Sequence, residues 1–343
     1  MKKYLTKLVN GIELSYTEME EAAACLLHPQ TSESEIAAFL MGINVKGAVP
    51  DEMAALSQAI RAASTHKFTA GEAAMDICGT GGDGSNSFNI STTTAFVLAS
   101  GGVKVIKHGN RGITSRSGSM DVLESLGISL SQNAEEAKKM IEQTNIAFLF
   151  AQHVHPQLKK IVKVRKDLGI PTVFNSLGPL TNPVSLTYQV TGVYSPKLLD
   201  PYAEVFLKLG RKKAVVIHGA GGMDEASLQG ENQLRIIENG SSRAETVRPA
   251  ELGLKEVSNL EIRGGSPERN ADILLSVLEG DRGPFTDTVL LNAGIGFFAS
   301  EKAGTIKEGI ELADSLLQSG RTYSHFKKIL EISKAVSKEE AII

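Results

Sequence analysis

From Met75 onward the chain alternates between short apolar runs and longer amphipathic stretches, and this alternation restricts its fold more than any other feature. The apolar runs have the length of buried strands and lie at Val103–Ile106, Ile146–Phe150, Val190–Tyr194 and Ala214–His218. The stretches between them have helical periodicity and lie at Ser117–Leu126, Ala134–Gln143, Pro156–Leu168 and Leu198–Leu209. Strands separated by helices predict an α/β domain with a mainly parallel sheet flanked by helices.

Residues 1–70 lack any strand pattern and predict helices only. Ser15-x-x-Glu18 and Ser32-x-x-Glu35 are capping boxes, in which serine and glutamate side chains pair with free N–H groups at a helix start. A chain of 343 residues exceeds the size at which one hydrophobic core keeps growing. We therefore predict a small helical domain at 1–70 and a larger α/β domain at 71–343, and some helices around 155–185 could pack on the helical domain.

The C-terminal third predicts further helices, at Ala271–Leu278, Lys307–Gln318 and Ser324–Ser333. Residues 240–265 are polar, without clear periodicity, and are compatible with a loop that contains short strands.

Charge and composition exclude several classes of partner. The formal net charge is −3, so no global basic field predicts nucleic-acid binding, and an anion must be bound by a local site. There is no run of about 20 apolar residues, so we expect no membrane span. The two cysteines, Cys25 and Cys78, are far apart and favour free thiols in a reducing cytoplasm.

A glycine-rich segment follows the first expected strand. Gly79, Gly81, Gly82 and Gly84 lie close together, where backbone N–H groups can approach an anion because no Cβ intervenes. Ser91-Thr92 then falls where the next helix should begin, so hydroxyls and free helix N–H groups converge there. This pattern suits a phosphate or pyrophosphate, although a tight turn with a serine cap would look the same. It matches neither a Walker A loop nor a dinucleotide fingerprint.

A second candidate anion site follows the strand at Val103–Ile106. Lys107-His-Gly-Asn-Arg111 and Thr114-Ser-Arg-Ser-Gly-Ser119 gather cations and hydroxyls between a strand end and a helix start. Ligands of open α/β sheets bind at that edge, so two such segments predict a ligand with phosphates at both ends. His108 by itself is more typical of a structural hydrogen-bonding residue than of a catalyst.

Asp224-Glu225 is the candidate metal site. Adjacent carboxylates on a loop suit Mg²⁺, which commonly bridges one or two carboxylates and substrate phosphate oxygens. The alternative is a solvated acidic pair that caps the next helix. Asp83 lies inside the anion loop, where a carboxylate would repel the ligand unless it orders the loop or reaches a donor or metal-bound water.

Arg165 lies in an apolar-patterned helix, where an unpaired cation would be costly. A substrate carboxylate is one suitable partner because guanidinium matches it in a bidentate fork. A structural salt bridge is the alternative. The Asn-, Gly- and Pro-rich stretch 175–183 predicts a structured hinge or turn.

Taken together, these motifs resemble the anthranilate phosphoribosyltransferase family, including Phe174-Asn-x-Leu-Gly-Pro-Leu-x-Asn-Pro183, in order and spacing. The resemblance implies a nucleoside phosphorylase/phosphoribosyltransferase-like fold with a hinged helical domain that forms a homodimer. It implies transfer of the 5-phosphoribosyl group to anthranilate. Because an aromatic amine is a weak nucleophile, we expect the leaving group to depart early, without a covalent intermediate or a strong general base. The small differences are at Gly112-Ile113-Thr114, Met120 and Gln152.

The resemblance also implies roles for individual residues. It places Mg²⁺ at Ser91, Asp224 and Glu225, and anthranilate at Gly79, Asn110 and Arg165. Contacts with 5-phosphoribosyl 1-diphosphate are implied for Gly79, Gly82, Asp83, Ser87, Asn89, Ile90, Ser91, Thr92, Lys107, His108, Gly109, Asn110, Arg111, Gly112, Ile113, Thr114, Ser115 and Ser119. A pyrimidine nucleoside phosphorylase and a non-catalytic sensor of phosphoribosyl ligands are the competing interpretations. The first should carry a Lys-His-Ser motif beside its glycine loop, where this chain has Asp76-Ile-Cys78.

Overall fold

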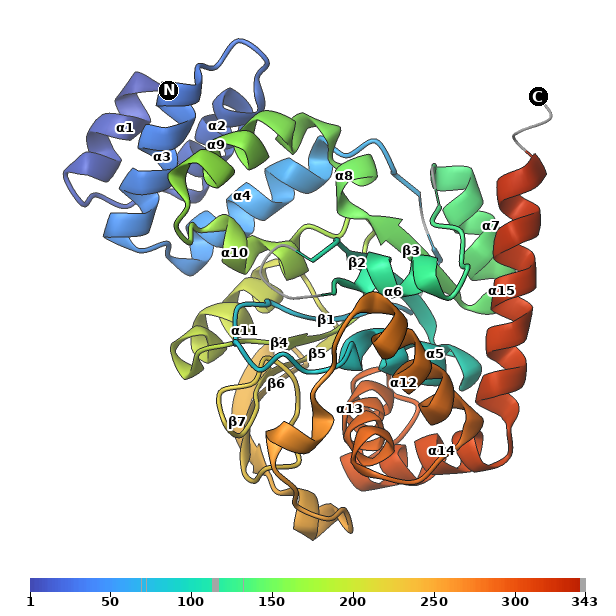
Figure 1. Ribbon diagram of the computed structural model, residues 1–343. Helices are drawn as coiled ribbons and strands as arrows, with labels where there is room; N and C mark the ends of the chain where they lie inside the picture. The colour runs from blue at the N-terminus through green and yellow to red at the C-terminus, as the bar shows by residue number, and fades with distance from the viewer. Residues whose placement is uncertain (69, 72, 113–116, 132, 340–343) are drawn as a thin grey trace.

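The computed structural model describes residues 1–68, 70–71, 73–112, 117–131 and 133–339 of the chain, which form a helical bundle beside a sheet flanked by helices (Figure 1). The strands are β1 Ala74–Gly79, β2 Lys104–Gly109, β3 Ile146–Phe150, β4 Tyr188–Gly192, β5 Lys213–His218, β6 Asn232–Glu238 and β7 Ser241–Val247. This is the predicted α/β architecture, and the strand positions inferred for β2 to β5 are confirmed to within a few residues.

The sheet has the order β3-β2-β1-β4-β5-β6-β7. The first five strands in sequence pair in parallel, whereas β6 and β7 extend the sheet as an antiparallel hairpin. The chain moves outward from β1 to β3 and then returns to place β4 on the other side of β1. The carboxyl ends of β1 and β4 are therefore a topological switch point, where open α/β sheets bind ligands.

Helices cover both faces of the sheet (Figure 1). Along β5 the apolar side chains alternate, so Val215 and Ile217 belong to one core and Ala214 and Val216 to the other. The helices between β1 and β5 are α5 Ile90–Ser100, α6 Ser119–Ser125, α7 Ala134–Thr144, α8 Ala151–Val154, α9 Lys159–Leu168, α10 Phe174–Leu177 and α11 Leu199–Lys208, with short 3₁₀ turns at Pro156–Leu158, Gly178–Leu180 and Pro196–Leu198. The C-terminal helices are α12 Pro267–Glu279, α13 Pro284–Ala299, α14 Ile306–Gln318 and α15 Arg321–Glu339, preceded by 3₁₀ turns at Pro249–Leu252 and Asn259–Ile262.

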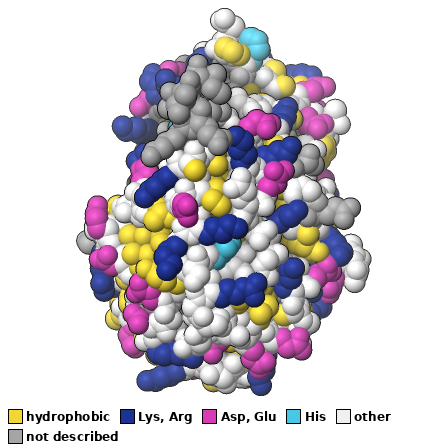
Figure 2. Space-filling view, turned by 90° about the vertical axis from the view of Figure 1, so that its right-hand side faces the viewer, with side chains coloured by type: hydrophobic (Ala, Val, Ile, Leu, Met, Phe, Trp, Pro, Cys, Tyr) yellow, Lys and Arg dark blue, Asp and Glu magenta, His cyan; other side chains and the backbone are white. Residues whose placement is uncertain are grey.

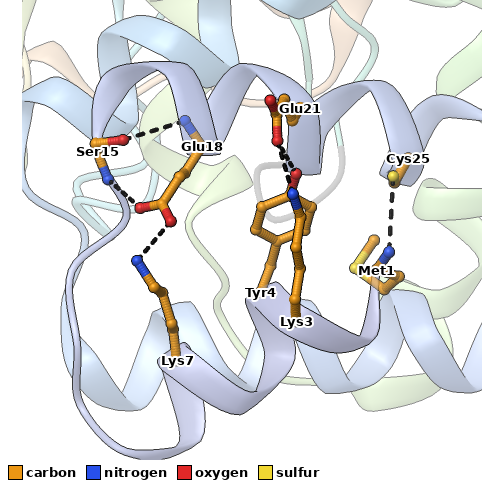
Figure 3. Close-up of polar contacts among 8 residues, drawn as sticks. All are labelled: Met1, Lys3, Tyr4, Lys7, Ser15, Glu18, Glu21 and Cys25. Carbon is orange, nitrogen blue, oxygen red and sulfur yellow. Dashed lines mark hydrogen bonds and ion pairs between the residues drawn. The ribbon is translucent and has the colours of Figure 1, made fainter.

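The first four helices form the bundle, and they are α1 Lys2–Val9, α2 Tyr16–Leu27, α3 Glu33–Lys46 and α4 Pro50–Ala62. The capping boxes predicted at Ser15 and Ser32 are both present and start α2 and α3. Lys7 pairs with Glu18 of the first box, and Lys3 and Tyr4 both contact Glu21, so polar contacts tie α1 to α2 (Figure 3).

The bundle shares its apolar core with later parts of the chain. Phe39, Leu40 and Leu56 of the bundle lie in one cluster with residues of α9, α10, α11 and one face of the sheet. Helix α9 packs on α3, and α11 packs on α4 as well as on β5 and β6. Bundle and sheet are thus joined through residues about 100 or more positions beyond the bundle in the sequence.

Two parts of the C-terminal half were not anticipated. Strand β6 begins before the region expected to hold short strands, whereas β7, a largely exposed edge strand without an apolar alternation, lies within that region. Helix α13 is buried on nearly all sides, so its sequence lacks the polar face that marks an amphipathic helix. Among the described residues, no helix is both long and apolar enough to cross a membrane. On the side of the molecule where α15 lies, lysine and arginine side chains alternate with acidic ones (Figure 2).

Candidate active site

Two glycines from neighbouring strands form a seat at the switch point. Gly79 ends β1 and Gly192 ends β4, and the two residues are register partners. Asp224, which follows β5 through the tight turn at Gly219–Met223, lies directly over them. A Cβ at Gly79 would collide with the Asp224 carboxylate, and a Cβ at Gly192 would collide with the Asp224 carbonyl oxygen. Glycine at both positions is therefore what lets the carboxylate reach the strand ends.

The glycine-rich loop after β1 is organised around the same aspartate. Gly81 donates its backbone N–H to Asp224 Oδ2 at 2.6 Å. Asp83 accepts from the backbone N–H groups of Ser85 at 3.1 Å and Asp224 at 3.4 Å. Gly82, like Gly81, has a positive φ, near 84°, that a residue with a side chain rarely adopts. Of the two roles considered for Asp83, the geometry supports ordering of the loop.

The acidic pair is buried rather than solvated, which disfavours a role as an exposed helix cap. Asp224 and Glu225 are each 8% exposed. The pKa of Glu225 is raised to about 7, chiefly by burial and also by the charge of Asp83, although Lys107 and Ser91 act to lower it. Burial also raises the pKa of Asp224 well above its ordinary value, and the charges of Asp83 and Glu225 add to this. Desolvated carboxylates that repel one another favour either protons or a bound cation.

No three His, Cys, Asp or Glu residues within the described ranges converge as a ready metal cluster. A cation at Asp224 and Glu225 would therefore keep positions for water or ligand oxygens, which is the preference of Mg²⁺ rather than of Zn²⁺.

Lys107 is a buried cation that connects β2 to the start of α5. Its side chain donates to the Ile77 carbonyl oxygen at 2.7 Å and to Ser91 Oγ at 3.1 Å. Ser91 in turn lies beside Glu225, whose charge it helps to stabilise. The structure therefore brings together Ser91, Lys107 and Glu225, although Ser91 and Glu225 are 134 positions apart in the sequence.

Asn89, Ile90 and Thr92 belong to the start of α5, which leads away from the loop. Asn89 is the residue before the helix, and its side chain makes no bond to the free N–H groups of the first turn. Ile90 and Thr92 are each 1% exposed, so both residues are buried at the start of the helix. Ser87 lies further back in the loop and donates its N–H to Ser85 Oγ at 3.2 Å.

The described parts of the second predicted segment, residues 107–112 and 117–119, are joined to each other by hydrogen bonds. Ser119 Oγ donates to the Asn110 carbonyl oxygen at 3.3 Å, and a Cβ at Gly109 would collide with that hydroxyl. Asp121 accepts from the N–H groups of Gly112 at 2.9 Å and Gly118 at 2.8 Å. The predicted residues Ile113, Thr114 and Ser115 lie outside the described residues.

Arg111 contributes less free positive charge than the sequence suggests. Its guanidinium pairs with Glu124 at 2.7 Å and with Asp121 at 3.7 Å, and it lies over the ring of Phe150. The buried Lys107 is therefore the better candidate for the cation that faces a phosphate.

His108 is a neutral residue inside the protein. Its ring packs edge-to-face on His155, with ring centroids 5.3 Å apart. Burial lowers the pKa of His108 to about 3 and that of His155 to about 4. This supports the structural interpretation of the His108 side chain.

The buried histidine pair predicts a measurable pH dependence of stability. An unfolded histidine binds a proton below pH about 6.5, whereas His155 in the fold stays neutral down to about 4. The free energy of unfolding should therefore fall as pH decreases through this window, by up to about 1.4 kcal/mol per pH unit for each such histidine. Between pH 7 and pH 5, the free energy of unfolding of His155→Gln should fall by less than that of the parent protein. Urea titrations of both proteins at the two pH values check this.

The parent and His155→Gln must be compared because buried acids change the free energy of unfolding with pH in the opposite direction. Burial raises the pKa of Asp76 to about 6, so its contribution to the free energy of unfolding increases as pH falls. This contribution is present in the parent and in His155→Gln. Equal pH slopes for His155→Gln and the parent would contradict the assignment.

The comparisons with known proteins agree with one another over almost the whole chain. Residues 2–64 match the model of the glycosyl transferase family helical bundle domain, and residues 71–323 match that of the family's a/b domain. A curated anthranilate phosphoribosyltransferase from Oceanobacillus iheyensis is 50% identical over 98% of this chain and 99% of its own length. One from Exiguobacterium sibiricum is 49% identical over the full length of both chains. The chain belongs to the anthranilate phosphoribosyltransferase family.

Solved structures of this family have the same fold. The crystal structure of anthranilate phosphoribosyltransferase from Thermus thermophilus matches with a TM-score of 0.91 at 39% identity, covering 96% of this chain and 99% of that one. The Saccharomyces cerevisiae enzyme in complex with PRPP and Mg matches with a TM-score of 0.88 at 30% identity, covering 97% of both chains. A further structure of the yeast anthranilate phosphoribosyltransferase contains 4-fluoroanthranilate. The fold inferred from the sequence is thereby confirmed at the level of the family.

Arg165, the residue that the family resemblance assigns to the acceptor, lies on α9 and is half-buried. Its guanidinium contacts Asn175 Oδ1 at 3.2 Å and lies over the ring of Phe174. None of the ion pairs between described residues includes Arg165, so the structure offers no support for the alternative of a structural salt bridge. The described contacts do not join Arg165 to Asn110 or Gly79, and the three-residue acceptor site stays a prediction.

Sequence reasoning missed one wall of the site. Arg263, Gly264, Gly265 and Asn270 line a pocket of about 170 Å³ together with Asn86, Ser87 and Ser117. The signal that could have found this wall is Gly-Gly-Ser-Pro at 264–267, in which Ser266 caps α12 and Pro267 is its first residue.

Asp76 and Asn182 form a second, buried contact that was not assigned. Asn182 Nδ2 donates to Asp76 Oδ2 at 2.9 Å and to the Ile106 carbonyl oxygen at 2.8 Å. Asn182 thereby joins β1 to β2 near the strand ends that lead into the two anion loops. These two hydrogen bonds account for the polar residue at position 182, after the Gly-Pro turn.

Proposed function

We propose that the chain transfers the 5-phosphoribosyl group from 5-phosphoribosyl 1-diphosphate to the amine of anthranilate, in tryptophan biosynthesis. The products are N-(5-phosphoribosyl)anthranilate and pyrophosphate. The observation that carries the proposal is Asp224, seated on Gly79 and Gly192 beside an ordered glycine loop, with Ser91 and Lys107 next to Glu225. The family's structures with PRPP and with 4-fluoroanthranilate support the choice of substrates.

The donor is proposed to lie between the glycine loop and the segment that begins at Lys107 and leads to α6. Backbone N–H groups of Gly82 and of the first turn of α5 point their partial positive charge at its phosphoryl oxygens. Lys107 supplies a full positive charge to this site. Its ammonium is held in place by hydrogen bonds to the Ile77 carbonyl oxygen and to Ser91 Oγ.

Asp224, Glu225 and Ser91 are the residues that would hold Mg²⁺, and the buried, mutually repelling carboxylates fit a divalent cation. When bound with the donor, the ion would supply positive charge next to the pyrophosphate. The protein itself contributes the position of the carboxylates. The glycine seat and the Gly81 N–H fix Asp224, and Ser91 bonds to Glu225.

The reaction breaks the bond from ribose C1 to the pyrophosphate oxygen and forms a bond from C1 to the anthranilate nitrogen. The aromatic amine is a weak nucleophile, so the leaving group departs early and positive charge develops on the ribose. Catalysis then depends on positioning and on preorganised charge rather than on a general base. The amine proton passes to pyrophosphate or to solvent.

Removing the guanidinium of Arg165 tests the acceptor site. Arg165→Ala should raise the KM for anthranilate by about 10- to 100-fold, the loss expected for one charge-assisted contact of about 1.5–3 kcal/mol. The KM for the donor should stay within about twofold of the parent value, because no contact among the described residues connects Arg165 to the glycine loop. Steady-state kinetics with each substrate varied in turn checks both values.

Lys166→Ala is the matched control, since Lys166 is the exposed neighbour on the same helix. It should leave both KM values unchanged. An Arg165→Ala enzyme with weakened donor binding and normal anthranilate binding would refute the carboxylate role.

The function itself is tested by the fluorescence of anthranilate. Signal should disappear only when donor and Mg²⁺ are both present, with one pyrophosphate released for each anthranilate consumed. Phosphorolysis of thymidine would instead identify a pyrimidine nucleoside phosphorylase. Donor binding in calorimetry without pyrophosphate release would identify a sensor.

We further propose that the chain is a homodimer joined through the bundle. Large apolar side chains are exposed there, among them Val9 at 79% and Val45 at 82%. Val162, on the adjoining α9, is 48% exposed. Single surface apolar residues are common, but several on packed neighbouring helices are typical of an interface. Val45→Asp combined with Val162→Asp should convert a dimeric mass in light scattering to the monomeric one, whereas an unchanged dimer would place the interface elsewhere.

A further inference from the structure

Asn270 lies in the wall that the sequence did not reveal, and it contacts a proposed donor residue directly. It is 2% exposed on α12, and its Nδ2 donates to Asn89 Oδ1 at 2.7 Å. Its own Oδ1 accepts from the Gly265 N–H at 2.7 Å. The carboxamide is therefore fixed at both ends, which sets the position of its nitrogen and oxygen atoms.

Asn89 is the point at which three segments meet. It ends the glycine-rich loop and precedes α5, while its Nδ2 donates to the Ser117 carbonyl oxygen at 3.4 Å. Its Oδ1 accepts from Asn270, 181 positions further along the chain. The side chain of Asn89 thus connects the first loop to the second loop and to α12.

The segment before α12 is shaped to allow this contact. Gly264 donates its N–H to the Asn86 carbonyl oxygen at 2.9 Å, and Phe88 donates to the Ile262 carbonyl oxygen at 3.2 Å. A Cβ on Gly264 would approach both Asn270 Oδ1 and the Phe88 backbone too closely. The two chain segments therefore run side by side, and this brings Asn270 within reach of Asn89.

A buried carboxamide is costly unless its donors and acceptors are paired. Exchanging the donor of Asn270 for an acceptor would leave the two oxygens of residues 270 and 89 facing each other. Asn89 would then have to turn away, which breaks its contact with Ser117 and shifts the start of α5.

We propose that Asn270 is a positioning residue for the phosphoribosyl donor, acting through Asn89. It does not touch the donor. By fixing the Asn89 carboxamide it holds the junction of the glycine loop and α5 against the second loop, so that the N–H groups at this junction point into the donor site. This inference rests on the proposed function.

Asn270→Asp tests the proposal with an isosteric change that keeps the acceptor for the Gly265 N–H. The KM for 5-phosphoribosyl 1-diphosphate should rise about tenfold, while the KM for anthranilate stays within about twofold. Ser266→Ala is the control, because it removes the cap of α12 but leaves residues 89 and 270 intact. It should lower the melting temperature without raising the donor KM.

A double-mutant cycle with Asn89→Ala separates positioning from a general structural effect. In that background Asn270→Asp should change the donor KM by less than about twofold, because the group it acts on is gone. An equal effect in both backgrounds, or no effect of Asn270→Asp on the donor KM, would overturn the proposal. If Asn270→Asp fails to fold, Asn270→Ser, which is too short to reach Asn89, replaces it in the same cycle with the same expected outcomes.

These results are distinguishable from failure of the proposed function. If the parent protein consumes no anthranilate in the presence of donor and Mg²⁺, the function is wrong, whatever Asn270 does. If the parent is active and the cycle is additive, only the positioning role is wrong.

Discussion

Replacing Asp224 with Asn and Glu225 with Gln together is expected to reduce the kcat for phosphoribosyl transfer by at least about a thousandfold, because each preorganised charge at a leaving group is typically worth 10²- to 10³-fold. Both amides keep the shape of the parent side chains, so the glycine seat stays filled. What is lost is the negative charge that would hold a cation beside the pyrophosphate.

The same double variant should be more stable than the parent in the absence of ligands. The raised pKa values of the two carboxyls mean that the fold disfavours their charged forms at neutral pH. Thermal unfolding without Mg²⁺ checks this, and activity at limiting Mg²⁺ checks the loss of turnover. Near-normal turnover under that condition would remove the metal assignment.

Glu256→Gln with Glu261→Gln is the charge-matched control. Both residues are exposed, and the change in net charge is the same. Turnover and Mg²⁺ dependence should equal those of the parent, which would show that general electrostatics does not explain the effect of the Asp224 and Glu225 changes.

The second large effect is expected from a single methyl group. Gly192→Ala would place a Cβ against the Asp224 carbonyl oxygen and push the loop after β5 away from the strand ends. We expect kcat/KM for the donor to fall by about 10²-fold or more, because misplacing a catalytic group by about 1 Å can cost that much. Overpacking should also lower the free energy of unfolding by about 1–3 kcal/mol.

Gly304→Ala provides the matched control for this substitution. Gly304 does not have a positive φ, and the atom that its new Cβ would meet is the flexible end of Glu308. Kinetics and thermal unfolding should match the parent. A Gly192→Ala enzyme with parental kinetics would show that Asp224 does not need its seat at the strand ends.

Local rules were sufficient for much of this fold. The two capping boxes start helices where the Ser-x-x-Glu spacing places them, and the apolar run Ile146–Phe150 is a strand with those bounds. In each case the signal lies within a few neighbouring residues. The same holds for the glycine loop, whose positive φ angles follow from its composition.

The parts that escaped prediction depend on partners distant in sequence. Nothing near Asn270 indicates that it meets Asn89, since this contact needs α12 to fold back over α5. Arg111 looked like a free cation, but folding brings Glu124 to it. Helix α13 could not be recognised from amphipathic periodicity because neighbours cover it on nearly all sides.

The shared core of bundle and sheet has a consequence for the order in which the protein folds during synthesis. The four bundle helices leave the ribosome first, yet α9, α10 and α11, which cover them, lie about a hundred or more residues later. Strand β1 likewise waits for β4 to complete its pairing. The bundle and β1 must therefore keep apolar surface exposed until β4 and α11 have also emerged, and such surface makes a nascent chain prone to aggregate.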